Sequence, residues 1–396
     1  MARSGASERP VRRGWAVLGY GFRPFFLLAG AYAAIAVPAF LIMRAGLADA
    51  PVVWPPMLWH AHEMIFGYAT AVIAGFLLTA VPGWQQAPPV AGVRLGVLVA
   101  LWAAGRAAMW TQGLWPPLAV AAVDLAFLPA LVAVGVPALL APRAARNRIF
   151  LAVLSVLVLA NLLIHAAAAG RAPFVLGADL GLDTLALLIA ILGGRVVPAF
   201  TTNALAAGGR RGLVRAADRR DVVAVATVVL VLLADGLSPW IGTTVPALLA
   251  LLAAAANAWR MVGWGTPATR HAPIVWVLHL GYAWLAVGLA AKGLGGLGLI
   301  DPASARHGIA VGAVGTMPLA VMTRAALGHT GRPIVAAKPI VLAYVLVSLA
   351  AIGRLAAPLA DWLVSTSGLA WSLAFVLFTV VYAPILCRPR PDGRPG

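Results

Sequence analysis

The chain has 396 residues, of which 62% are hydrophobic and only 10% charged, and its formal net charge is +17. A soluble domain contains about 45–50% apolar and about 25% charged residues, so this composition excludes an ordinary water-soluble fold. The single cysteine excludes a disulfide scaffold and a Cys-ligated iron–sulfur cluster. The chain has neither a Walker A loop nor a GxGxxG turn that opens a helix after a strand, so nucleotide chemistry lacks a motif.

Residues 1–23 carry several arginines and form an expected interfacial or cytoplasmic segment, without the cleavage site of a removable signal peptide. A helix needs about 20 apolar residues to cross a bilayer. Loops, charges and prolines divide the rest into about twelve such spans, which predicts an all-α polytopic membrane protein with one transmembrane domain over residues 1–396. The predicted spans begin near Pro24, Ala61, Leu95, Pro117, Ile149, Asp179, Val222, Pro239, Ala272, Gly308, Pro339 and Gly368.

The basic residues are distributed unevenly between the predicted loops. Most of the 29 Lys and Arg residues fall in segments on the same side of the membrane as the N-terminus, including the basic loop 201–221 and the tail 387–396. The positive-inside rule therefore predicts that both termini are cytoplasmic. The positive charge is explained by topology, and we expect the partner to be the lipid bilayer and not nucleic acid.

The second predicted span opens with two histidines and a glutamate, His60, His62 and Glu63. At 100° per residue His60 and His62 diverge by about 200°, so a regular helix cannot direct both at one metal. His60 and Glu63 lie about 60° apart and are expected to form a pair, with His62 serving a different site. Ionisable groups inside a bilayer cost free energy, so this cluster is a functional candidate.

Three further spans each contribute an imidazole: His165 and His307 near the outer boundary and His279 about 13 Å from the inner edge. Neutral imidazole is the commonest protein ligand of transition metals and a frequent axial ligand of haem iron. We therefore hypothesise that these histidines converge with those of the second span. For each one alone, an interhelical hydrogen bond is the alternative.

A second polar group is expected on the cytoplasmic side, with Arg195, Arg324 and His329. It is interpreted either as topogenic charge with helix capping, or as a site for carboxylates such as haem propionates, or as an inner gate. Asp124 and Asp183 fit a proton relay or simple hydrogen bonds to neighbouring groups. Four methionines are candidate copper ligands or packing residues: Met64, Met109, Met317 and Met322.

The chain resembles the NnrS family of membrane proteins over nearly its whole length. The segments WHAHEM (59–64) and GHTGR (328–332) are the most specific. Further matching segments are 22–26 (FRPFF), 75–82 (GFLLTAVP), 194–201 (GRVVPAFT) and 278–284 (LHLGYAW).

The resemblance implies a twelve-helix protein of the bacterial cytoplasmic (inner) membrane that holds haem, expected to be b-type, and copper, and acts in the nitric oxide response. It implies five ligand candidates, with Glu63 as a proton donor or orienting group, and Arg195, Arg324 and His329 as contacts of haem carboxylates or structural supports. Turnover of nitric oxide would require an electron donor such as a quinol or a cytochrome. The rival hypotheses are a secondary transporter and a haem- or metal-handling protein. The five ligand candidates are His60, His62, His165, His279 and His307.

Overall fold

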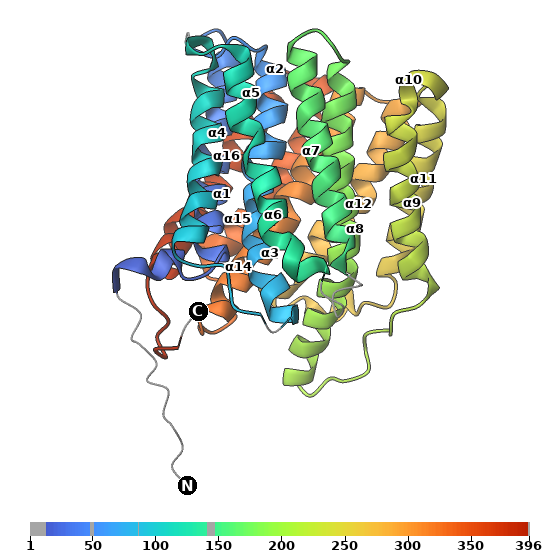
Figure 1. The fold of residues 1–396 in the computed structure, drawn as a ribbon. Helices are drawn as coiled ribbons and strands as arrows, with labels where there is room; N and C mark the ends of the chain where they lie inside the picture. The colour runs from blue at the N-terminus through green and yellow to red at the C-terminus, as the bar shows by residue number, and fades with distance from the viewer. Residues whose placement is uncertain (1–12, 48–50, 86, 141–146, 395–396) are drawn as a thin grey trace.

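The structure is a computed structural model that describes residues 13–47, 51–85, 87–140 and 147–394. Residues 1–12 of the predicted N-terminal segment and the last two residues of the tail lie outside the described ranges. Within these ranges every regular element is a helix (Figure 1). The expected all-α membrane fold is thus confirmed.

The N-terminal half begins with the short 3₁₀ helix η1 (Arg13–Leu18) and contains eight α-helices. A π-helical segment, η2 (Glu63–Ala69), joins α2 to α3, so that the three form one continuous helical unit. The α-helices are α1 (Phe22–Arg44), α2 (Pro56–His62), α3 (Thr70–Gln85), α4 (Val93–Trp110), α5 (Pro117–Leu125), α6 (Phe127–Leu140), α7 (Ile149–Ala168) and α8 (Phe174–Ala207).

The C-terminal half repeats this feature, because a second π-helical segment, η6 (Gly308–Ala313), joins α13 to α14. Its α-helices are α9 (Arg219–Gly236), α10 (Ser238–Ile241), α11 (Thr244–Met261), α12 (Pro273–Gly296), α13 (Pro302–His307), α14 (Val314–His329), α15 (Lys338–Leu355) and α16 (Trp362–Cys387). Three further short 3₁₀ helices lie in the connections of the two halves: η3 (Gln112–Leu114), η5 (Thr266–Thr269) and η7 (Ala357–Leu359).

Eleven helical units among the described residues are long and apolar enough to cross a membrane. The twelfth expected span corresponds to α9, which has 18 residues but carries charges at both ends, from Arg219 to Asp235. It packs against α8 and α11. Sequence analysis placed the next span from Pro239, whereas the structure ends the short α10 at Ile241 and begins α11 at Thr244.

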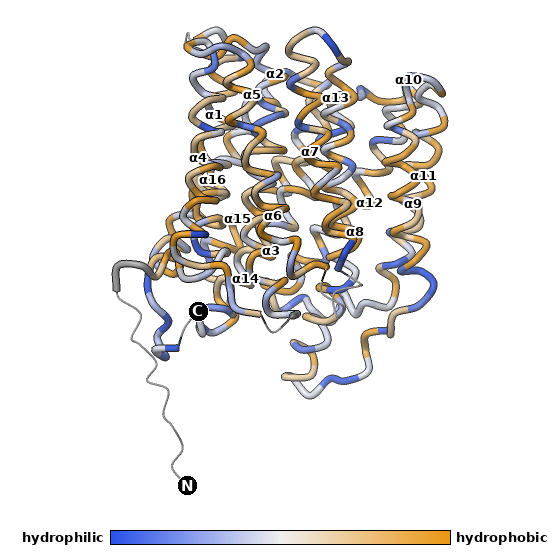
Figure 2. Tube along the Cα trace, in the orientation of Figure 1, coloured by the Kyte–Doolittle hydropathy of each residue, from blue (hydrophilic) through white to orange (hydrophobic). Residues whose placement is uncertain are grey.

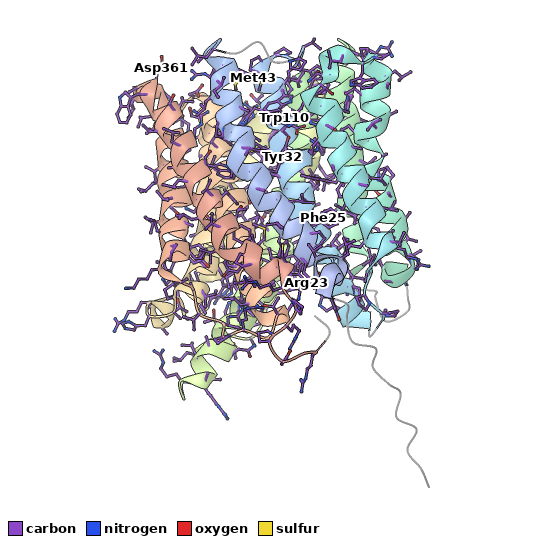
Figure 3. The ribbon with its side chains drawn as sticks, turned by 90° about the vertical axis from the view of Figure 1, so that its left-hand side faces the viewer. Arg23, Phe25, Tyr32, Met43, Trp110 and Asp361 are labelled. Atoms are coloured by element: carbon purple, nitrogen blue, oxygen red, sulfur yellow. The ribbon has the colours of Figure 1, made fainter. Side chains whose placement is uncertain are left out.

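The helices form one upright bundle (Figure 1). Helix η1 and the last turn of α16 lie at the same end, which we call the terminal end, while α10 lies at the opposite, far end. Apolar residues dominate the body of the bundle, and the polar segments that follow α8 and α16 lie at the terminal end (Figure 2). Figure 3 places Arg23 near the terminal end and Asp361 at the far end.

Close helix packing positions the elements that carry the site. A Cβ atom added to Gly288 of α12 would lie 2.6 Å from the carbonyl carbon of Gly308, at the start of η6. Only glycine therefore lets these two backbones approach so closely. Gly293 of α12 serves in the same way, because a Cβ there would lie 2.6 Å from Leu251 of α11.

Candidate functional site

Two helical units widen into π-helix directly after a candidate histidine. Segment η2 follows His62, and η6 follows His307. Single π-helical turns inside α-helices occur frequently at functional sites, because the extra residue changes the direction of the preceding side chains. Helix α13 is capped by Asp301, whose carboxylate accepts a hydrogen bond from the Ser304 backbone at 2.7 Å. Hydrogen bonds from Ser304 hold the pKa of Asp301 below its usual value.

Seven side chains form a buried polar cluster in the half of the bundle nearer the far end, where Figure 3 places Tyr32. They come from α1, α2, η2, α4, α5 and α7. The members of the polar cluster are Tyr32, His62, Glu63, Arg106, Asp124, Asn161 and His165.

Asp124 is the centre of this cluster. Its Oδ2 atom lies 3.0 Å from Nε2 of His62 and 3.0 Å from Nε2 of His165. The Asn161 amide donates to the same oxygen at 2.9 Å. The guanidinium of Arg106 contacts the other carboxylate oxygen. Two imidazoles from α2 and α7 are thus brought to one carboxylate from α5.

Glu63 joins the other side of His62. Its Oε1 atom lies 2.8 Å from Nδ1 of His62 and also contacts Arg106. Its Oε2 atom accepts from the Tyr32 hydroxyl, which in turn accepts from Trp110 at 2.8 Å. The expected pairing of Glu63 with His60 is wrong: the chain widens into η2 at Glu63, and the carboxylate points toward His62 and Arg106.

The polar cluster has the donors of a metal site. Among the described residues, the ligand atoms of His62, Asp124 and His165 lie within 4.8 Å of one another. A carboxylate on Nδ1 of His62 leaves the Nε2 lone pair facing the centre, as in carboxylate–histidine–metal arrangements. Glu63 and Asp124 against Arg106 leave one surplus negative charge when both imidazoles are neutral. The donor set and this charge fit one bound cation.

His60 points away from this cluster into a separate cavity of about 210 Å³, which we call the histidine cavity. Its ring stacks on Phe40 with centroids 4.1 Å apart, and its buried Nδ1 atom has no hydrogen-bond partner among the described residues. The expected divergence of His60 and His62 is therefore confirmed. His307, from the end of α13, lines the same cavity.

The histidine cavity fits a large planar apolar group with carboxylates. Nδ1 of His307 lies 2.7 Å from the Ala303 carbonyl, and Nε2 accepts a hydrogen bond from the Arg354 guanidinium at 3.1 Å. Arg306 and Arg354 both line the cavity. Most other lining residues are apolar or aromatic, namely Val37, Phe40, Leu41, Met64, Ile65, Tyr68, Leu182, Val311 and Trp371. Imidazoles, apolar walls and guanidinium groups are compatible with a haem and its carboxylates.

His279 joins neither group. Its Nε2 atom lies 2.8 Å from the Thr201 hydroxyl, and its Nδ1 atom lies 2.9 Å from the Thr266 hydroxyl. Both ring nitrogens are thus engaged by neighbouring threonines, an arrangement that ties α12 to α8 and η5. This is the interhelical hydrogen bonding that the sequence left as the alternative.

Arg195, Arg324 and His329 lie together in a second cavity, which we call the basic cavity, of about 1700 Å³. The Arg324 guanidinium stacks on Phe200 at 3.9 Å from the ring centroid, and Arg195 donates to Asn147. The aromatic lining residues include Phe22, whose ring centroid lies 5.4 Å from that of His329. The expected grouping of these three residues is thus observed, in a cavity whose lining includes none of the residues of the histidine cavity.

Sequence reasoning gave no role to five residues of the site: Tyr32, Arg106, Asn161, Arg306 and Arg354. Arg106 had a signal, since an arginine inside a span requires buried partners. Tyr32 and Arg354 had none, because a tyrosine in a span and an arginine at a helix end are common. Of the four methionines, only Met64 lines the histidine cavity.

A family model described as NnrS protein matches residues 16–390. The chain belongs to the NnrS family. A comparison with curated proteins finds no match. The NnrS match spans both π-helical units, the polar cluster and both cavities, so all the described site residues lie inside the family region.

Proposed function

We propose that this NnrS protein binds haem and copper and acts in the nitric oxide response, binding or turning over nitric oxide within the bilayer. The observation that carries the proposal is the divergence of two neighbouring imidazoles. His60 faces an apolar cavity with a second histidine and two arginines, whereas His62 faces a carboxylate and another histidine. One helical turn thereby serves two adjacent sites of different chemistry.

In this proposal the histidine cavity holds the haem. His60 and His307 would hold the haem iron, and Arg306 and Arg354 would contact the haem carboxylates. When bound, haem iron would coordinate nitric oxide once one of the two histidines is displaced. The apolar walls exclude water, and they admit a small apolar molecule directly from the lipid.

The copper is proposed to lie at His62, Asp124 and His165. Imidazole nitrogen is a good ligand for copper, and a monovalent copper ion would neutralise the surplus charge of the polar cluster. Glu63 orients His62 through Nδ1 and holds or passes a proton at its carboxylate, because it lies between Tyr32, His62 and Arg106.

The proposal also covers the orientation of the chain in the membrane, the basic cavity and the electron donor. The arginine-rich terminal end is proposed to face the cytoplasm of a bacterium, with the chain in the inner membrane. The basic cavity is proposed to accept an anionic group on Arg195, Arg324 and His329, such as the carboxylates of a second haem. A quinol or a cytochrome would supply the electrons for turnover.

The test is the absorption spectrum and metal content of the purified protein and its single variants. We expect His60→Ala and His307→Ala to lose the Soret band and keep copper. We expect His62→Ala and His165→Ala to lose copper and keep the Soret band. The exposed His271→Ala is the matched control and should keep both. A wild-type protein without haem, or a Soret band that does not shift on adding nitric oxide, would contradict the proposal.

A second candidate function is secondary transport, favoured by the size of the basic cavity and by two interrupted helical units. Broken helices around charged sites are typical of transporters. His62, His165, Glu63 and Asp124 would then be proton or substrate sites. Colourless, metal-free protein that dissipates a proton gradient in vesicles would favour this function. Colourless apoprotein that takes up haem or copper and releases it to an acceptor would instead indicate a handling protein.

A further inference from the structure

A second buried ionic cluster lies between α8, α9, α12 and α13, outside the polar cluster. Nζ of Lys292 lies 2.6 Å from Oδ1 of Asp183 and 2.8 Å from Oδ2 of Asp235. One turn before Asp183 on α8, Asp179 accepts two hydrogen bonds from Arg306, at 2.6 and 3.0 Å. We call these five residues the lysine cluster.

The lysine cluster is not balanced in charge. Three carboxylates face two cations, and the Asp183 side chain is only 1% exposed. An uncompensated charge inside a membrane span costs free energy. Either one carboxyl group carries a proton or the cluster retains this cost.

The position of the surplus proton follows from the hydrogen bonds. Oδ2 of Asp183 is buried, and no donor among the described residues reaches it. Asp183 and Asp235 meet at the same Lys292 ammonium, at 2.6 and 2.8 Å. Two ionised carboxylates only accept, so they can bond to each other only when one of them is protonated.

We propose that Asp183 and Asp235 share one proton beside Lys292, and that this pair exchanges protons between the far boundary of the bundle and the histidine cavity. Asp235 lies next to the last residue of α9, and its side chain is 13% exposed, so it can exchange protons at the surface of the bundle. Asp179 and Arg306 line the histidine cavity. Only O–H bonds change: the pair releases one proton toward Asp179 and takes one up at Asp235.

The shared proton and its delivery into the histidine cavity depend on different observations. The shared proton rests on the lysine cluster alone and does not depend on what the cavity binds. Delivery into the cavity rests on the proposed function, because turnover of nitric oxide at a haem would consume protons. The infrared test can therefore disprove the shared proton while haem and copper binding are confirmed. Haem and copper binding can likewise be disproved while the shared proton is confirmed.

Infrared spectroscopy of the full-length protein tests the shared proton, because a protonated carboxyl group has a carbonyl stretch that shifts in D₂O. We expect Asp183→Asn and Asp235→Asn each to remove one such band. The exposed Asp361→Asn is the control and should leave it in place. Persistence of the full band in both variants, or its absence from the wild type, would overturn the proposal.

Lys292→Met is a second test that does not remove a carboxyl group. Without the ammonium, each carboxyl group of the pair needs its own proton, so the band assigned to the pair should increase about twofold. An unchanged band would mean that Lys292 does not balance the pair, and would also overturn the proposal. Circular dichroism and size-exclusion chromatography identify variants that fail to fold.

Discussion

Arg106 determines the electrostatics of the polar cluster. It is buried in α4 and contacts the carboxylates of both Glu63 and Asp124. Removing one member of a buried ion pair leaves a charge without a partner, and this costs more than the pair itself contributes. The arginine thus holds two acidic groups next to His62 that would otherwise repel each other.

Replacing Arg106 by methionine should therefore destabilise the fold strongly. We expect Arg106→Met to lower the free energy of unfolding by about 3–5 kcal/mol, because two buried carboxylates lose their cation. The midpoint of thermal unfolding in detergent measures this. Arg94→Met, at an exposed position of the same helix, is the control and should shift the midpoint little. Equal midpoints for the two variants would contradict the assignment.

Glu63 is expected to act on the metal through His62. Glu63→Gln keeps the size of the side chain but removes the charge that faces Nδ1, and losing such a partner lowers metal affinity about 10–100-fold. Competition with a copper chelator measures the change. Asp392→Asn alters an exposed carboxylate and should leave the affinity unchanged. If copper binds Glu63→Gln as tightly as the wild type, Glu63 has no orienting role.

At the scale of elements, the two π-helical segments position the site. Each begins directly after a site histidine, and η6 packs backbone to backbone against α12. This packing fixes the depth of α13 and hence of His307. The site therefore depends on helix geometry that is remote from any ligand.

Widening that contact should displace His307. A Cβ on Gly308 would lie 2.8 Å from the Cα of Gly288, so Gly308→Ala must push α12 and η6 apart. We expect a stability loss of about 1–3 kcal/mol and reduced haem content per mole of protein. Gly83→Ala, with open space around its added Cβ, is the control. Full haem content in Gly308→Ala would show that the close approach does not position the ligand.

At the scale of the whole molecule, the bundle has two dissimilar ends. Both ends of the described chain and the arginine-rich segments lie at the terminal end, and the polar cluster lies nearer the far end. The positive-inside rule assigns the terminal end to the cytoplasm. The proposed metal sites then lie nearer the outer surface of the membrane.

The single cysteine offers a direct test of this orientation. Cys387 is exposed at the end of α16. A membrane-impermeant thiol reagent should label it in inside-out vesicles and not in right-side-out vesicles. The reverse pattern is expected for Asp361→Cys combined with Cys387→Ser. Labelling of Cys387 in intact right-side-out vesicles would place the terminal end outside.

The sequence alone determined the membrane fold, the charge asymmetry and the divergence of His60 from His62. Each of these follows from composition or from the period of a single helix. Only the tertiary structure decided that Glu63 faces His62, that Asp124 joins two histidines, and that threonines engage His279. Such contacts join residues up to 78 positions apart, and they depend on the rotation and depth of each helix. Apart from His279 and Lys292, helix α12 is apolar, so its own pattern indicates its rotation only weakly, and packing against its neighbours decides it.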